Sequence, residues 1–95
     1  MVLMTLLFPA LALGETMDDL VITNGLYFKK FTNVPFTGKV TGKTQGKIKN
    51  GKKEGPRVGY HENGWLSFKG TYKDGKEVGR WVRYWSDGSE MIREY

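Results

Sequence analysis

Between residues 56 and 95 the sequence alternates apolar and polar residues with a period of two, which is typical of β-strands that bury one face. Four runs carry this alternation, at residues 56–61, 65–72, 80–85 and 90–95. Four turn signals lie between and before them: Asn50-Gly51, Asn63-Gly64, Asp74-Gly75 and Asp87-Gly88. Because both residues of such pairs tolerate the positive φ of primed two-residue turns, the pattern predicts four hairpins in series, assembled as an antiparallel meander.

The first 14 residues have a different character. They contain no ionisable side chain, and residues 2–13 are almost continuously apolar. This length suits the apolar region of a secretory signal better than a membrane span, and small residues follow it, so we expect a signal helix cleaved near Gly14 or after Ala12. The alternative is an apolar segment that joins the core. The expected division is a signal peptide at 1–14, a lead-in at 15–24 and a domain at 25–95, with the mature chain exported to the periplasm or the medium.

An internal repeat organises the domain. Residues 46–69 align without gaps on residues 70–93, an offset of 24. Eight positions are identical: Gly46/Gly70, Lys49/Lys73, Gly51/Gly75, Lys52/Lys76, Gly55/Gly79, Val58/Val82, Tyr60/Tyr84 and Gly64/Gly88. Phe68/Ile92 is among the conservative matches. We therefore expect two structural units, with Gly55 and Gly79 each supplying an unusual backbone angle that either widens the loop or forms a bulge.

Strand alternation assigns side chains to two faces. The predicted core is Ile48, Val58, Tyr60, Leu66, Phe68, Tyr72, Val82, Tyr84 and Ile92. The other face would carry Lys69, Met91 and Arg93 together with a candidate binding face of Arg57, His61, Trp65, Trp81, Arg83 and Trp85. Tryptophan with arginine could receive sugar rings, an anionic headgroup or a partner protein. The alternative is that these side chains stack across strands only to stabilise a thin sheet.

Two strings resemble the bacterial variant of the MORN repeat. They begin at Gly46 (GKIKNGKKEGP) and at Gly70 (GTYKDGKEVGRW), and each is followed by Val-x-Tyr and then Asn-Gly or Asp-Gly. The segment 35–39 resembles a degenerate opening unit, which gives units at 25–45, 46–69 and 70–93. The resemblance implies an all-β, single-layer antiparallel sheet of stacked hairpins, often exported, used for binding or scaffolding and sometimes labelled antitoxin. One departure is Pro56-Arg57, which stands where the second unit has Arg80-Trp81.

Composition and charge narrow the function. The chain has 95 residues, no cysteine and a formal net charge of +5, which excludes disulfides, thiolate metal sites and a two-domain enzyme. Eight lysines occur between residues 29 and 53 with no acidic residue among them. The candidate anion-binding lysines are Lys43, Lys47, Lys49, Lys52 and Lys53. Envelope lipids, acidic glycans or an acidic protein fit better than nucleic acid, for which no motif is present. The alternative is that these lysines only discourage strand edges from pairing with neighbours.

Catalysis has little support in the sequence. His61 is the single histidine, and its equivalent in the second unit is Trp85. No carboxylate pair, serine motif, metal-ligand spacing or phosphate loop accompanies it. We expect no enzyme, cofactor or metal site, but an exported interaction module that binds a protein or an acidic envelope component, with peripheral membrane contact left open. The alternative is a structural fragment that self-associates through its sheet edges and has no ligand of its own.

Overall fold

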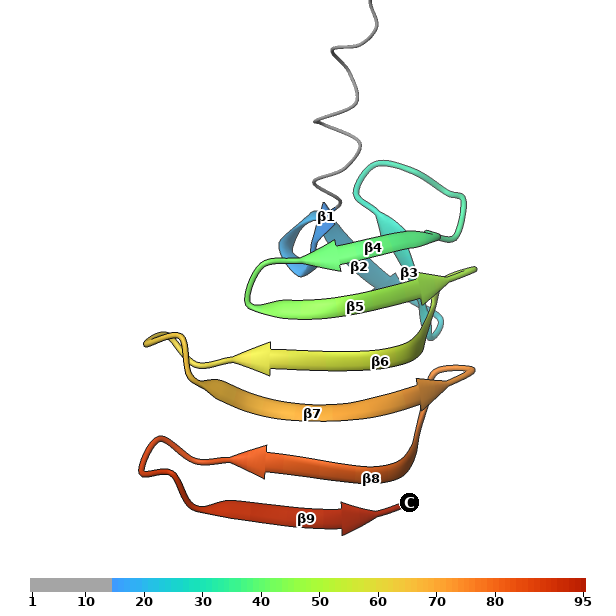
Figure 1. The fold of residues 1–95 in the computed structure, drawn as a ribbon. Helices are drawn as coiled ribbons and strands as arrows, with labels where there is room; N and C mark the ends of the chain where they lie inside the picture. Colours follow the sequence, from blue (N-terminus) through green and yellow to red (C-terminus); the bar gives the residue numbers. More distant parts are fainter. Residues whose placement is uncertain (1–14) are drawn as a thin grey trace, which may run out of the picture.

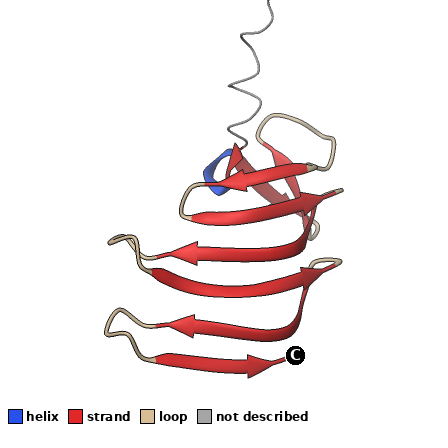
Figure 2. Ribbon diagram, in the orientation of Figure 1, coloured by secondary structure: helices blue, strands red, loops and turns tan. Residues whose placement is uncertain are grey.

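The computed structural model describes residues 15–95, and over that range the chain is mostly β-strand (Figures 1 and 2). The strands are β1 (Glu15–Thr16), β2 (Leu20–Thr23), β3 (Leu26–Lys29), β4 (Gly38–Thr41), β5 (Thr44–Lys49), β6 (Lys52–Tyr60), β7 (Leu66–Lys73), β8 (Lys76–Tyr84) and β9 (Glu90–Glu94). A short 3₁₀ turn, η2 (Met17–Asp19), follows β1. The all-β prediction is confirmed, whereas the predicted signal helix lies outside the described residues.

Seven strands form one sheet in the order β1-β4-β5-β6-β7-β8-β9 (Figure 1). From β4 to β9 each strand pairs antiparallel with the next one along the chain, and β1 pairs parallel with β4. No helix among residues 15–95 is both long and apolar enough to span a membrane.

A separate hairpin, β2–β3, packs on one face of this sheet at its N-terminal end, behind β4 and β5 in Figure 1. Leu20 from the hairpin is buried against Val40 and Ile48 of the sheet. Met17, Tyr27 and Phe36 pack against these three residues. We call the covered side of the sheet the hairpin face. The fold therefore has two layers at this end, where a single layer was expected.

Three tight turns lie at one end of the strands, on the right in Figure 1. In Asn24-Gly25, Asn50-Gly51 and Asp74-Gly75 both residues have positive φ, as type I′ turns require. Backbone hydrogen bonds tie these hairpins together, from Tyr27 N to Gly51 O (2.8 Å) and from Gly75 N to Lys53 O (3.0 Å). Two of these turns were predicted; Asn24-Gly25 was not, and a unit beginning at residue 25 would divide the β2–β3 hairpin.

The loops at the opposite end are not primed two-residue turns, which corrects the prediction. At Asn63-Gly64 and Asp87-Gly88 only the glycine has positive φ. Gly64 N donates to His61 O and His61 N donates to Trp65 O, which closes a three-residue loop, and the loop after β8 repeats this arrangement. The Asn63 and Asp87 side chains accept hydrogen bonds from the backbone N–H two residues later, an arrangement that favours negative φ at Asn63 and Asp87.

The unusual backbone angles predicted at Gly55 and Gly79 are confirmed, and of the two expected outcomes, a widened loop or a bulge, the structure has the bulge. Gly55 and Gly79 have φ of 81° and 68°. The β5–β6 register shifts between Gln45 and Lys47, opposite Gly55, and the β7–β8 register shifts between Lys69 and Thr71, opposite Gly79.

The predicted core is wrong in part, because the register of β7 differs from the one assumed. Gly59 pairs with Phe68 and Arg57 pairs with Gly70, so Phe68 shares a face with Arg57 and not with Val58. By alternation the hairpin face carries three of the predicted core residues, Ile48, Phe68 and Tyr72, whereas Lys69 lies on the opposite face. The other six, Val58, Tyr60, Leu66, Val82, Tyr84 and Ile92, lie on the opposite face.

The burial of individual side chains also differs from the prediction, because residues predicted for the binding face are buried and a residue predicted for the core is exposed. Among the described residues the buried side chains include Arg57 (3% exposed) and Trp81 (4% exposed), while Tyr60 is exposed. Trp81 lies against Phe68, Tyr72 and Tyr95, with ring centroids 6.0, 5.0 and 6.5 Å away. We call these four residues the Trp81 cluster. The Phe68 and Trp81 rings are nearly parallel (19°) and lie over glycines that leave room beneath them: a Cβ at Gly59 would stand 2.1 Å from the Phe68 ring, and a Cβ at Gly70 would stand 2.1 Å from the Trp81 ring.

The last strand departs from the repeat. The β6–β7 register shifts between Gly59 and Tyr60, whereas β8 and β9 pair without a shift from Tyr84↔Glu90 to Arg80↔Glu94. Phe68 therefore lies on the hairpin face and Ile92, its match in the alignment, on the opposite one. Met91 and Arg93 instead join the Trp81 side of the sheet.

Candidate functional site

A hollow with aromatic walls lies on the hairpin face, at the end where the three type I′ turns meet. Its volume is about 470 Å³. The lining residues come from all three turns and their flanking strands: Ile22, Gly25, Tyr27, Gly51, Lys52, Lys53, Tyr72, Gly75, Lys76, Glu77 and Tyr95. We call it the tyrosine hollow. Three tyrosines and three lysines thus face a common space, with Glu77 as the one acidic residue.

Lys53 is the best-positioned cation in the tyrosine hollow. Its ammonium lies 5.0 Å from the Tyr72 ring centroid and 5.7 Å from that of Tyr27, within the range of a cation–π interaction with each. No carboxylate of residues 15–95 forms an ion pair with it. The two rings hold a half-buried positive charge in place while leaving it free to meet an anion.

Arg57 adds a second positive charge beneath this region. Its Nη2 donates a 3.1 Å hydrogen bond to Met17 Sδ, and its buried Nη1 has no hydrogen-bond partner among the described residues. Burial lowers the pKa of Arg57, and the nearby Tyr72 and Tyr27 partly oppose that effect. The guanidinium lies over Gly46, as Trp81 lies over Gly70 one unit later.

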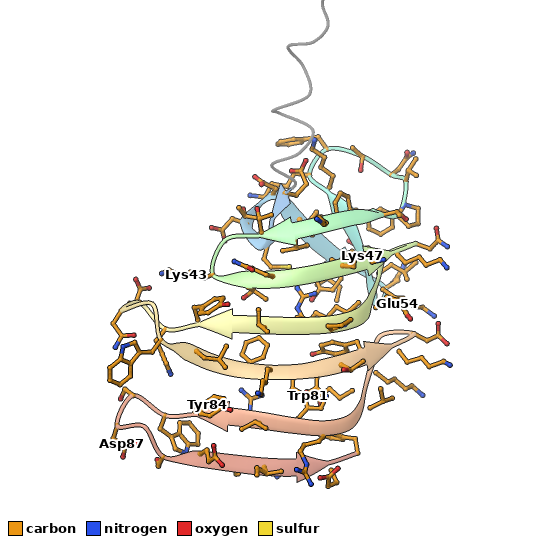
Figure 3. All side chains as sticks on the ribbon, in the orientation of Figure 1. Lys43, Lys47, Glu54, Trp81, Tyr84 and Asp87 are labelled. Carbon is orange, nitrogen blue, oxygen red and sulfur yellow. The ribbon has the colours of Figure 1, made fainter. Side chains whose placement is uncertain are left out.

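The five predicted anion-binding lysines do not form one patch. Lys43 lies at the far end of β5 from Lys47 (Figure 3) and forms an ion pair with Glu62, which lowers the pKa of that carboxyl group. Lys47 and Lys49 alternate with Ile48 and so lie on the opposite face, where Lys47 pairs across the strands with Glu54 (Figure 3). Only Lys52 and Lys53 line the tyrosine hollow, joined by Lys76, which the sequence analysis did not single out.

The predicted binding face is also divided. Arg57 and Trp81 are buried, and Arg83 lies at the edge of the Trp81 cluster with its guanidinium 5.9 Å from the Phe68 ring centroid. The other three predicted residues lie at the loop end of the strands. His61 Nε2 donates to the Tyr84 carbonyl oxygen (2.8 Å), while Trp65 and Trp85 are 59% and 51% exposed. Trp81 therefore belongs to the core, and the alternative reading of cross-strand stacking describes it.

Sequence reasoning missed the tyrosines of the hollow. Tyr72 was assigned to the core, and Tyr27 and Tyr95 were not assigned to any site. The available signal was their position: Tyr27 follows the Asn24-Gly25 turn and Tyr72 precedes the Asp74-Gly75 turn, so stacked turns bring both rings to the same end. That stacking is a tertiary contact, which periodicity does not encode.

Within residues 15–95 no group of three or more His, Asp or Glu side chains is arranged to hold a metal ion. Comparison of the whole chain with protein-family models, with curated proteins and with solved structures finds no match.

Proposed function

We propose that the protein is a non-catalytic, exported binding module of MORN-like units, and that its tyrosine hollow receives an anionic group of an envelope component or of an acidic protein. The observation that carries this proposal is Lys53. Lys53 is a half-buried residue, its ammonium lies within cation–π range of two rings, and no acid among the described residues pairs with it, so its charge is available to an anion.

Neighbouring charges support the same assignment. Lys52 and Lys76 line the hollow with Lys53, and Glu77 offsets only one of these three charges. The Arg57 guanidinium, close enough to Tyr27 and Tyr72 to interact with them, raises the local positive potential further. Export is proposed from the apolar segment 2–13, and the MORN-like units from the 24-residue repeat.

The test is retention of the full chain on liposomes. We expect binding to vesicles that contain an anionic lipid, weakening as salt is raised, and no binding to neutral vesicles. Lys52→Gln/Lys53→Gln should reduce retention by about tenfold or more, since each lysine near an anionic surface contributes about 1 kcal/mol. The matched control, Lys39→Gln/Lys47→Gln, removes the same charge from two paired residues outside the hollow and should bind more tightly than the first variant. Equal losses in the two variants would contradict the hollow as the site.

A second candidate is the structural fragment that joins another copy edge to edge without a ligand. The exposure of every residue of β9 favours it. Molecular mass measured at several dilutions separates the two candidates, because obligate pairing predicts no folded monomer at low concentration.

A further inference from the structure

β9 leaves one edge of the seven-stranded sheet open. All five of its residues are exposed, and it has a pairing partner on the β8 side alone among residues 15–95. Trp85 N donates to Ser89 O, and Tyr95 N donates to Gly79 O. Hydrogen bonding alternates along an antiparallel strand, so the backbone groups of Glu90, Ile92 and Glu94 point away from β8, toward the open edge.

The hairpin face beside this edge contains a small aromatic notch. Its volume is about 160 Å³, and it is lined by Glu77, Trp81, Arg83, Met91, Arg93 and Tyr95. Neither Arg83 nor Arg93 forms an ion pair within the described part of the chain. Two guanidinium groups that form no ion pair among the described residues, and one carboxylate, Glu77, therefore line an aromatic notch next to unpaired strand backbone.

We propose that β9 is a docking edge for an extended peptide segment of a partner protein, which adds as an antiparallel strand and brings a carboxylate to Arg93 and Arg83. This proposal goes beyond the anion site in the tyrosine hollow and does not depend on it.

Cross-strand complementarity defines the chemistry of the segment, because residues directly opposite each other share a face and interact. On the hairpin face the segment carries an aromatic residue opposite Tyr95, an acid opposite Arg93 and an aliphatic residue opposite Met91. On the other face it carries an aliphatic residue opposite Ile92 and a base opposite Glu90. Because Glu94 already forms an ion pair with Arg80 (2.6 Å), the segment carries a neutral residue opposite it.

A second copy of β9 fits this edge less well. If two copies pair antiparallel about Ile92, Glu90 of one faces Glu94 of the other, and if they pair about Arg93, the two Arg93 side chains face each other. Pairing about Met91 places Glu90 opposite Ile92. Each register sets like charges together or a charge against an apolar side chain, so the edge favours a strand of different sequence.

The experiment measures fluorescence anisotropy of labelled peptides with the full 95-residue chain. The complementary peptide is Phe-Thr-Glu-Val-Leu-Lys, and its charge-swapped control is Phe-Thr-Lys-Val-Leu-Glu. We expect the control to bind about tenfold more weakly, and Arg93→Glu to remove that preference, because each peptide then has one attractive and one repulsive charge pair, at positions 93 and 90. Ile92→Pro removes an outward N–H, which an edge strand tolerates, and should abolish binding, whereas Ile92→Thr should retain it.

Two controls ensure that a loss of peptide binding can be distinguished from a loss of folding. Circular dichroism establishes that each variant is folded, and Arg93→Glu tests the proposal independently of the proline variant. Equal binding of the two peptides, unchanged binding by folded Ile92→Pro, or no binding of either peptide overturns the proposal. Dimers in analytical ultracentrifugation that Ile92→Pro abolishes would assign the edge to a second copy and likewise overturn it. Loss of liposome binding in Lys52→Gln/Lys53→Gln with peptide binding intact would show that the two sites are separate.

Discussion

Arg57 and Trp81 occupy the same place in two successive units and meet different physical conditions there. Each side chain lies over a glycine of the neighbouring strand, Gly46 and Gly70 respectively. The indole buries apolar surface and satisfies its one donor, with Nε1 donating to Thr71 O at 3.1 Å. The guanidinium leaves Nη1 without a partner and lacks an acidic partner among the described residues. Arg57 is thus a destabilising feature of an otherwise repeated core position.

Replacing this buried cation should stabilise the fold. Arg57→Met keeps the unbranched stem over Gly46 and removes the desolvated charge, so we expect the free energy of unfolding to rise by about 1 kcal/mol and Tm by roughly 4–8 °C. Thermal denaturation followed by circular dichroism measures the shift. Arg93→Met, which removes an exposed charge on the same face, is the control and should change stability by less than about 0.5 kcal/mol. A lower Tm for Arg57→Met would show that the guanidinium stabilises its surroundings.

Alanine substitutions at Gly70 and Gly79 should destabilise the fold for different reasons, a steric clash at Gly70 and backbone strain at Gly79. At Gly70 a Cβ would stand 2.1 Å from the Trp81 ring, whereas at Gly79 φ is 68° and nothing lies within 4 Å of a Cβ. We expect Gly79→Ala to cost roughly 1–2 kcal/mol through left-handed strain, and Gly70→Ala to cost about 1–3 kcal/mol through displacement of the indole. Urea unfolding gives both values. Only Gly70→Ala should also shift Trp81 fluorescence, and the same shift in Gly79→Ala would argue against this division.

At the scale of elements, the two ends of the hairpins are built from different turns with similar sequences. The type I′ turns at Asn50-Gly51 and Asp74-Gly75 dock on neighbouring hairpins, since Gly51 O accepts from Tyr27 N and Gly75 N donates to Lys53 O. The loops 61–65 and 85–89 instead close on themselves through Asn63 and Asp87 side chains. The docked turns form the tyrosine hollow, and the self-contained loops carry the exposed Trp65 and Trp85.

The carboxyl group of Asp87, in the loop after β8, should titrate with a lowered pKa. Hydrogen bonds from the Ser89 hydroxyl, first, and from its backbone N–H hold the pKa of Asp87 below its ordinary value. Because the folded pKa is the lower one, the stabilisation is present above the unfolded pKa and is lost as pH falls through the folded pKa. Ser89→Ala should raise the Asp87 pKa toward its ordinary value in an NMR titration of the side-chain carboxyl. An unchanged pKa would show that the hydroxyl has no part in it.

Trp81 in a strand and Trp85 in a loop should contribute differently to the free energy of unfolding. Trp81 is the buried centre of the strand aromatics, and Trp85 is half exposed in a loop. We expect Trp81→Ala to cost about 3–5 kcal/mol, enough to unfold much of a small domain, and Trp85→Ala to cost far less. Chemical denaturation of both variants measures the difference. Similar costs would mean that the loop tryptophan is part of the same packed cluster.

At the scale of the molecule, the sheet is supported unevenly. The β2–β3 hairpin covers the hairpin face at the β4–β5 end, whereas the β8–β9 end relies on the Trp81 cluster. Strands β5 to β8 each have a neighbour on both sides, and β9 has one among the described strands. In a stack of this kind stability depends on contacts between neighbours, so it should fall toward the less supported edge.

Amide hydrogen exchange should show this gradient. We expect the slowest exchange in β6 and β7 and fast exchange at Glu90, Ile92 and Glu94, whose amides point outward. Mass spectrometry or NMR of the full chain measures it residue by residue. Protection of those three amides at the level of β7 would mean that another strand covers the edge in solution, and its concentration dependence would show whether that strand comes from a second copy.

The local features of the fold follow from short stretches of the amino-acid sequence. Period-two alternation, Asn-Gly and Asp-Gly pairs and the 24-residue repeat predicted the all-β class, the hairpins and the unusual backbone angles at Gly55 and Gly79, because each depends on the conformational preferences of a few adjacent residues. The tertiary structure alone decided which side chains meet. One extra residue in the hairpin between β6 and β7 moves Phe68, Gly70 and Tyr72 to the face of Arg57, and the packing of β2–β3 then brings Tyr27 to Lys53. A one-residue change in register reverses every side chain of a strand, and alternation in one strand carries no information about how its neighbour is aligned.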